Sequence, residues 1–117
     1  MRTVVLDTNF LLHCIDFKID FMRELERVLD ERFAVFVMDR TLKELTGKKQ
    51  ERLARALIEK LGIKLIKAAE GVSVDNALLC LPSDAIVGTQ DKALKEKLKK
   101  RGLSVITIRQ RQYLIMV

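Results

Sequence analysis

The chain has 117 residues, 49% hydrophobic and 32% charged, which suits one globular domain with a single core. No apolar run approaches the length of a membrane span, and the opening residues lack the shape of a signal peptide, so we expect a cytoplasmic protein without a membrane partner. The formal net charge of +6 favours a polyanionic partner, most simply nucleic acid.

Apolar runs and amphipathic segments alternate through the first half of the chain. The apolar runs predict buried strands at residues 3–6 and 34–38. The amphipathic segments predict helices at 20–30, 41–45 and 50–61. In the last of these helices we expect Leu53, Leu57 and Leu61 to form the buried face, because they recur at helical spacing, and Gly62 to end the helix.

The same alternation continues through the second half. Strands are expected at 63–66, 85–88 and 104–108, and a charged helix at 92–101. Ser73 is placed to cap a helix that runs through residues 76–79 and ends before Pro82. Residues 113–117 form either an edge strand or a packing tail.

This order of elements predicts one α/β domain over residues 1–117. Strands that alternate with helices form a parallel sheet covered on both faces, here a three-layer α/β/α sandwich with a central five-stranded sheet. Ligands bind such sheets beyond the carboxyl ends of the strands. Asp7, Asp39 and Asp91 each follow a predicted strand, so acidic side chains gather at that edge.

Four acids can converge there: Asp7, Glu44, Asp75 and Asp91. Asp7 is flanked by apolar residues, and a carboxylate at the end of a buried strand is costly unless something satisfies it. Neighbouring carboxylates repel one another, and a hard divalent cation such as Mg2+ or Mn2+ removes that conflict. Because such an ion can activate water beside a phosphate, the cluster suggests metal-assisted phosphodiester hydrolysis.

Each of these acids also has an ordinary structural interpretation. Asp91 can cap the helix that begins at Lys92, and Asp75 can be a first-turn acid favoured by the helix dipole. Glu44 can be an exposed helix residue. For Asp39 we expect a capping role at the helix that begins near Arg40.

The basic residues suggest where RNA would bind. The charged helix at 92–101 is expected to be a solvated face, whereas four other cations are candidates to grip RNA phosphates: Lys48, Lys49, Arg109 and Arg111. The chain has one Tyr, no Trp and five Phe, so few aromatic rings are available for base stacking. His13, Cys14 and Cys80 complete no zinc or disulfide pattern, and we expect a packing histidine and two buried thiols.

Short motifs in this order resemble the PIN-domain family. They are Asp7-Thr8-Asn9, Glu44-Leu45, Asp75 in VDNALL, and Thr89-Gln90-Asp91. The following segment, KALKEKLKKRGLSVITIRQRQYL, resembles small PIN proteins related to ribosomal-RNA-processing endonucleases. It is less similar to VapC-type toxins, whose last motif usually runs TxNxxDF.

The resemblance implies a Mg2+- or Mn2+-dependent endoribonuclease that acts on RNA, expected to be single-stranded. Asp7, Glu44, Asp75 and Asp91 would be metal ligands, directly or through water, and Asn9 and Thr89 would orient them. A metal-bound water would attack and leave a 3′-hydroxyl and a 5′-phosphate. Many relatives have two adjacent acids at the third motif, whereas Asn76 follows Asp75 here, so we expect one firmly held metal.

Three alternatives stay open. The chain can be a non-cleaving PIN scaffold that binds RNA or protein, or a VapC-type toxin with an antitoxin partner rather than an RNA-processing enzyme with a ribosome-assembly partner. The apolar end 113–117 can form a homodimer interface or complete the monomer's own core.

Overall fold

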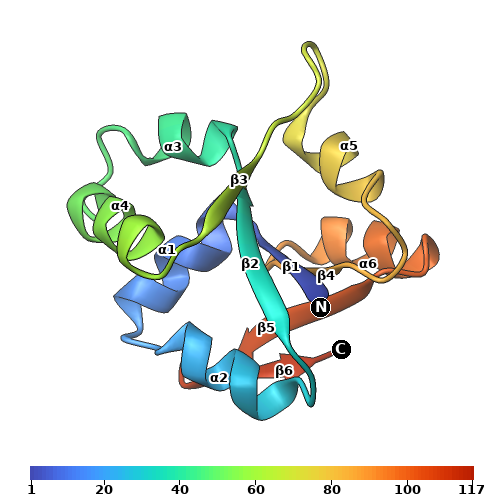
Figure 1. The fold of residues 1–117 in the computed structure, drawn as a ribbon, viewed down its shortest axis with the longest axis horizontal. Coiled ribbons are helices and arrows are strands. Elements are labelled where there is room, and N and C mark those ends of the chain that lie inside the picture. The colour runs from blue at the N-terminus through green and yellow to red at the C-terminus, as the bar shows by residue number, and fades with distance from the viewer.

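The sheet has six strands, in the order β3-β2-β1-β4-β5-β6 (Figure 1), in a computed structural model that describes residues 1–117. Their bounds are β1 (Arg2–Leu6), β2 (Phe33–Met38), β3 (Lys64–Ile66), β4 (Ile86–Gly88), β5 (Ser104–Arg109) and β6 (Tyr113–Met116). The first five are parallel, as predicted, and β6 is antiparallel to β5. Residues 113–116 are therefore an edge strand, and the sheet has one strand more than predicted.

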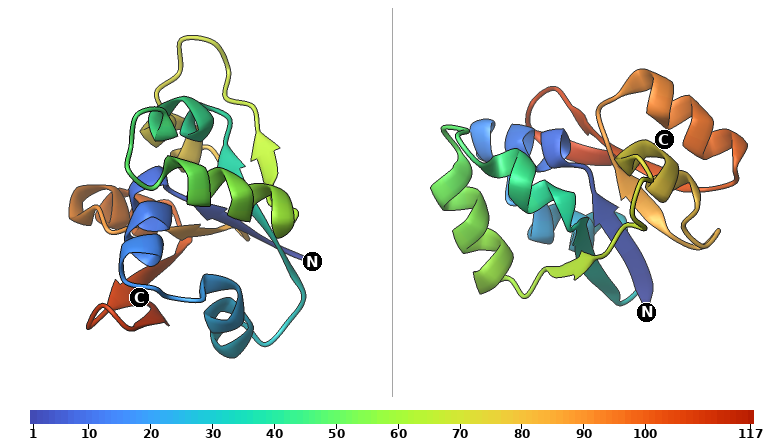
Figure 2. Two further views of the ribbon diagram at one scale, coloured as in Figure 1. Left: turned by 90° about the vertical axis from the view of Figure 1, so that its left-hand side faces the viewer. Right: turned by 90° about the horizontal axis from the view of Figure 1, so that it is seen from above.

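Helices cover both faces of the sheet and produce the predicted three-layer sandwich. They are α1 (Thr8–Asp16), α2 (Phe21–Val28), α3 (Arg40–Leu45), α4 (Glu51–Lys60), α5 (Val74–Leu79) and α6 (Lys92–Lys100). Seen from above, α1, α3 and α4 lie to one side of the strands, and α5 and α6 lie to the other (Figure 2). No helix has both the length and the apolar character needed to cross a membrane.

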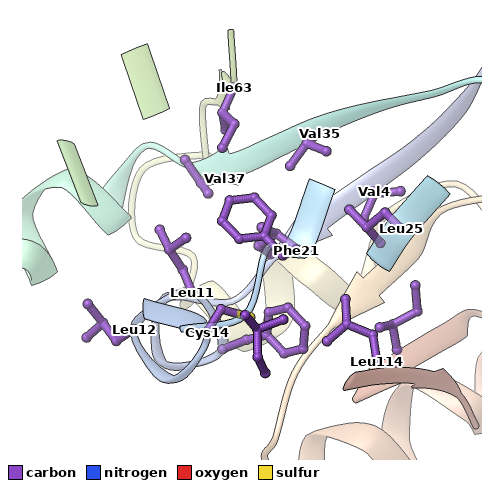
Figure 3. Packing of buried hydrophobic residues seen from close by; sticks show 14 of the residues in the cluster. Val4, Leu11, Leu12, Cys14, Phe21, Leu25, Val35, Val37, Ile63 and Leu114 are labelled. Carbon is purple, nitrogen blue, oxygen red and sulfur yellow. The ribbon is translucent and has the colours of Figure 1, made fainter. Parts of the chain in front are cut away.

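The continuous apolar strands supply both cores at once. Val4 and Leu6 of β1 belong to the larger core, which packs against α1, α2 and α4, whereas Val5 belongs to the smaller core beneath α5 and α6. Successive side chains of a strand point to opposite faces, so a strand covered on both faces is apolar throughout. In the larger core, Phe21 and Leu25 of α2 lie near Val35 of β2 (Figure 3). Burying one such side chain stabilises the fold by about 1.5–3 kcal/mol.

The predicted buried face of α4 is wrong in part. Leu53 is 52% exposed, and Ala54 and Ile58 are the buried residues of the helix. Leu57 and Leu61 are partly buried against the same core. Ala54, Leu57, Ile58 and Leu61 follow the i, i+3, i+4, i+7 pattern of a helix that packs on a core, and Leu53 lies outside that stripe.

Two cysteines and one histidine were expected to be packing residues. Cys14 is buried in the core, and burial raises the pKa of its thiol to about 12. Cys80, in contrast, is exposed, because it follows the last turn of α5 at the surface. The ring of His13 stacks on Phe17 at 5.8 Å, and its buried Nδ1 has no hydrogen-bond partner.

The edge strand β6 is tied to α2 by two hydrogen bonds to the backbone of Leu114. The backbone N–H of Leu114 donates to Glu24 Oε1 at 2.9 Å, and Arg27 Nη2 donates to the Leu114 carbonyl at 2.7 Å. Arg27 Nη2 also lies 3.0 Å from Glu24 Oε1. The hydrogen bonds from Arg27 and from the Leu114 N–H lower the pKa of Glu24. Both outward-facing backbone groups of Leu114 are thereby satisfied, which blunts an otherwise open sheet edge.

Candidate active site

Asp7 lies where β1 ends and α1 begins. Its backbone is extended, with φ −66° and ψ 146°, and its side chain does not cap the helix that follows. The Asp7 N–H donates to the Gly88 carbonyl at 2.9 Å, which joins this corner to β4. A Cβ on Gly88 would lie 3.0 Å from the side chains of both Leu6 and Phe10, so a glycine allows β4 to approach this corner closely.

The carboxyl of Asp7 is half-buried and its pKa is raised above the ordinary value. Burial is the largest cause, and the negative charges of Glu44 and Asp75 add to it. Hydrogen bonds from the Thr89 hydroxyl and the Thr8 backbone act in the opposite direction. The structure therefore brings Glu44 and Asp75 close enough to act on Asp7, although they lie on α3 and α5.

Glu44 is held near Asp7 by a pair of buried threonines. The Thr8 hydroxyl donates to Glu44 Oε1 at 2.9 Å, and its oxygen lies 2.8 Å from Thr41 Oγ1. Because a carboxylate only accepts, Thr8 must donate to ionised Glu44, and Thr41 then donates to Thr8. Neither threonine was predicted. Thr8 lies within the Asp7-Thr8-Asn9 motif, whereas Thr41 has no local signal in the sequence.

Thr89 connects Asp7 to Asp91. Its buried hydroxyl donates to Asp7 Oδ2 at 3.1 Å and accepts from the Asp91 N–H at 3.1 Å. Asp91 Oδ1 accepts from the Leu94 N–H at 3.0 Å, so Asp91 caps α6, as its structural interpretation predicted. Asp91 directly follows Gln90 and is exposed at the same edge of the sheet.

Gln90 fixes this loop to the neighbouring strand, a role that the sequence analysis missed. Its Oε1 accepts from the Ile108 N–H at 2.6 Å and from the Thr107 hydroxyl. The residue before it holds Asp7, and the residue after it is the acid that caps α6. The only local signal was its place between Thr89 and Asp91.

Asp75 and Asn9 lie on α5 and α1, two helices that cover opposite faces of the sheet. Asp75 is an exposed acid in the first turn of α5, and Ser73 caps that helix through the Asn76 N–H at 3.1 Å, as predicted. Asn9 is exposed in the first turn of α1.

Asp39 does not cap α3, so that expectation is wrong. Its backbone is already helical, with φ −57° and ψ −32°, and no capping bond forms. Its Oδ1 instead accepts from the Ala68 N–H at 3.3 Å and links β2 to the segment after β3. A capping residue needs an extended backbone to turn its side chain toward the first free N–H groups of the helix.

The four candidate RNA-binding cations lie at separate places. Lys48 and Lys49 are exposed between α3 and α4, and Arg109 is exposed at the carboxyl end of β5. Arg111 lies in the turn between β5 and β6, with its guanidinium 5.5 Å from the centroid of the Phe17 ring. Phe17 follows the end of α1 that is opposite Asp7, and a nine-residue helix is about 13 Å long, so Arg111 is not brought to the acids.

The donor set fits a hard cation held largely through water. No three Asp, Glu, His or Cys side chains are close enough to enclose a metal ion directly. All four predicted ligands offer only carboxylate oxygens, and none of them takes part in the ion pairs of the structure. Mg2+ usually keeps several waters and binds one or two carboxylates, which matches one inner acid, Asp7, surrounded by others.

Comparisons with known proteins identify the family. A family model described as "PIN like domain" matches residues 4–111. Ribonuclease VapC4 of Methanocaldococcus jannaschii is 34% identical over an alignment 125 positions long, which covers 97% of this chain and 95% of that protein. The solved structure of the PIN domain endonuclease Utp24 is similar in fold, with a TM-score of 0.83 and 22% identity over 97% of this chain and 90% of that one. The chain therefore belongs to the PIN-domain family.

Proposed function

We propose that this protein is an RNA-cleaving enzyme that uses Mg2+ or Mn2+. The observation that carries the proposal is Asp7, a half-buried carboxyl that faces two further acids and has no cationic side chain as a partner. A protein gains nothing in stability from such a group, so we attribute it to function. The similarity to a protein named as a ribonuclease supports RNA as the substrate.

The chain's own residues would divide the work as follows. Asp7 would be the inner ligand, and the Thr89 hydroxyl would orient its Oδ2. Glu44 would be held in place by Thr8. Asp75 and Asp91, at the starts of α5 and α6, would bind the cation through water from the other face of the sheet. When bound, the cation would activate a water and neutralise charge on the phosphate.

The substrate we propose is single-stranded RNA, cleaved in the cytoplasm. The acids lie at an exposed edge of the sheet and not in an enclosed cavity, which suits a chain that passes across them. The role of the cleavage has two candidates, RNA processing and a VapC-type toxin with an antitoxin partner. The 34% identity to Ribonuclease VapC4 favours keeping the second candidate.

The test is cleavage of a mixed-sequence single-stranded RNA in Mn2+ and in Mg2+. EDTA and the Asp7→Asn variant are run in parallel, and Mn2+ binding is measured by calorimetry. We expect cleavage by the wild-type protein that both controls abolish. No cleavage together with no Mn2+ binding would overturn the proposal and leave a binding module on a PIN fold.

A further inference from the structure

A polar hollow lies beside the acids, between α3 and the segment after β3. Its volume is about 410 Å³, and six residues line it: Asp39, Arg40, Lys43, Lys67, Ala68 and Glu70. The loop that carries the last three of these projects beyond the rest of the molecule (Figure 1). None of the three cations was among the predicted RNA-binding residues.

Two pieces of geometry place this hollow next to the proposed active site. In the register of β1 and β2, Leu6 pairs with Val37, so Asp39 follows β2 only one residue beyond the level of Asp7. On α3, Arg40 and Glu44 are four residues apart and share one side of the helix. The strand that Asp39 follows, β2, is the direct neighbour of β1, which Asp7 follows, and neighbouring strands lie about 4.8 Å apart.

The charges in the hollow favour an anion. Arg40, Lys43 and Lys67 outnumber Asp39 and Glu70 and belong to none of the ion pairs of the structure. Asp39 already accepts a hydrogen bond from Ala68, so part of its capacity is used within the protein.

Arg40 is the strongest indication of a ligand. Its side chain is partly buried, and no side-chain hydrogen bond or ion pair of the structure involves it. Its guanidinium carries five donors in a planar fork that matches a phosphate group. No acceptor of the chain occupies these donors, so they are free to bind a phosphate.

We infer that this hollow binds a backbone phosphate of the RNA, next to the phosphate that is cleaved. The inference rests on the proposed function, because it is the acids that place the scissile bond nearby. Arg40 grips the phosphate as a fork, and Lys43 and Lys67 add point charges from α3 and from the loop.

The test measures the affinity of a single-stranded RNA oligonucleotide in EDTA, where no cleavage occurs, across a range of salt concentrations. The variants are Arg40→Gln and Lys67→Gln, and the matched control is Lys97→Gln, an exposed lysine on α6. We expect each hollow variant to weaken binding about tenfold and to reduce the salt slope by about 0.7, the value for one phosphate contact on a single strand. The control should stay within about twofold of wild type.

Two further measurements separate this inference from the proposed function. In Mn2+, the hollow variants should raise KM for RNA and leave the Mn2+ affinity unchanged, because they lie outside the acid set. Unchanged RNA affinity and salt slope in both folded variants would overturn the inference even if the wild-type protein cleaves. If the wild-type protein neither cleaves nor binds Mn2+, the proposed function fails, while a tenfold loss confined to the hollow variants would still support the phosphate site. Lys67 is exposed, so its variant stays informative if Arg40→Gln is unstable.

Discussion

Two carboxylates, one beside the edge of the sheet and one at its centre, have opposite surroundings. Glu24, at the β6 edge, has the guanidinium of Arg27 at 3.0 Å and the Leu114 N–H at 2.9 Å, and its pKa is lowered. Asp7, at the centre of the sheet, is half-buried, faces Glu44 and Asp75, and has a raised pKa. Glu24 contributes to the stability of the fold, whereas ionised Asp7 opposes it.

The difference separates an acid with a structural role from the acid to which we attribute a function. A carboxylate that holds two elements together finds its partners within the protein, as Glu24 does between α2 and β6. A carboxylate that is kept ionisable near other acids has partners that come from outside. Four predictions test this contrast, beginning with the one of largest expected effect.

The largest effect is expected on cleavage. Asp7→Asn should lower the rate of RNA cleavage by about a hundredfold or more, because the inner carboxylate of the proposed cation site is removed. Single-turnover rates in saturating Mn2+ are the measurement. Glu24→Gln, which changes the other acid in the same way, should leave the rate within about twofold of wild type. Equal losses in the two variants would end the distinction between them.

A smaller effect is expected from the group that orients Asp7. Thr89→Val removes the hydroxyl that donates to Asp7 Oδ2, and it should weaken Mn2+ binding or cleavage by about tenfold. Thr89→Ser should restore both, since it keeps the hydroxyl. Thr3→Val, at the far end of β1, is the control for replacing a threonine in the sheet. Wild-type Mn2+ affinity and cleavage in Thr89→Val would remove Thr89 from the site.

Removing the carboxylate of Glu24 should destabilise the fold. Glu24→Ala should lower the free energy of unfolding at neutral pH by about 1 kcal/mol, because the backbone N–H of Leu114 loses its acceptor. The pKa of Glu24 is lowered by folding, so its contribution is present above its unfolded pKa and is lost as pH falls through the folded value. Urea unfolding from pH 7 to pH 3, with the exposed Glu26→Ala as control, should show the difference shrinking in acid.

Removing the charge of Asp7 should stabilise the fold. Asp7→Asn should raise the free energy of unfolding at pH 7 by about 0.5–1 kcal/mol, because a half-buried charge that faces two acids is replaced by a neutral amide. The pKa of Asp7 is raised by folding, so the cost of its charge develops as pH rises above the unfolded value and disappears below about 3.8. In thermal melts, Mn2+ should raise the melting temperature of the wild-type protein and not that of the variant. A destabilised Asp7→Asn would contradict the assignment.

Much of the fold was predictable because its signals are local. The apolar runs at β1 and β2 differ from the predicted strands by one residue, and Ser73 and Asp91 cap the helices predicted for them. A capping side chain acts on an N–H group three residues away, so the sequence alone contains the whole interaction. The same holds for alternation of strand and helix, which predicts a parallel sheet covered on both faces.

Contacts between distant segments were not predictable in this way. The Thr8–Thr41 and Thr8–Glu44 bonds span 33 and 36 residues, and the Thr89–Asp7 bond spans 82. The exposure of Leu53 and of Cys80 and the hydrogen-bond partner of Asp39 also depend on which element packs alongside. The phosphate hollow belongs here too, because its lining comes from α3 and from a loop more than twenty residues later.

The sequence by itself determined the strand and helix order, the apolar strands and the carboxylates that follow them, since each depends on residues a few positions apart. Only the tertiary structure decided that Glu24 is satisfied while Asp7 is not. The physical reason is that the pKa of a carboxyl depends on burial and on the charges that folding brings beside it: an arginine and a strand N–H for Glu24, two further acids for Asp7.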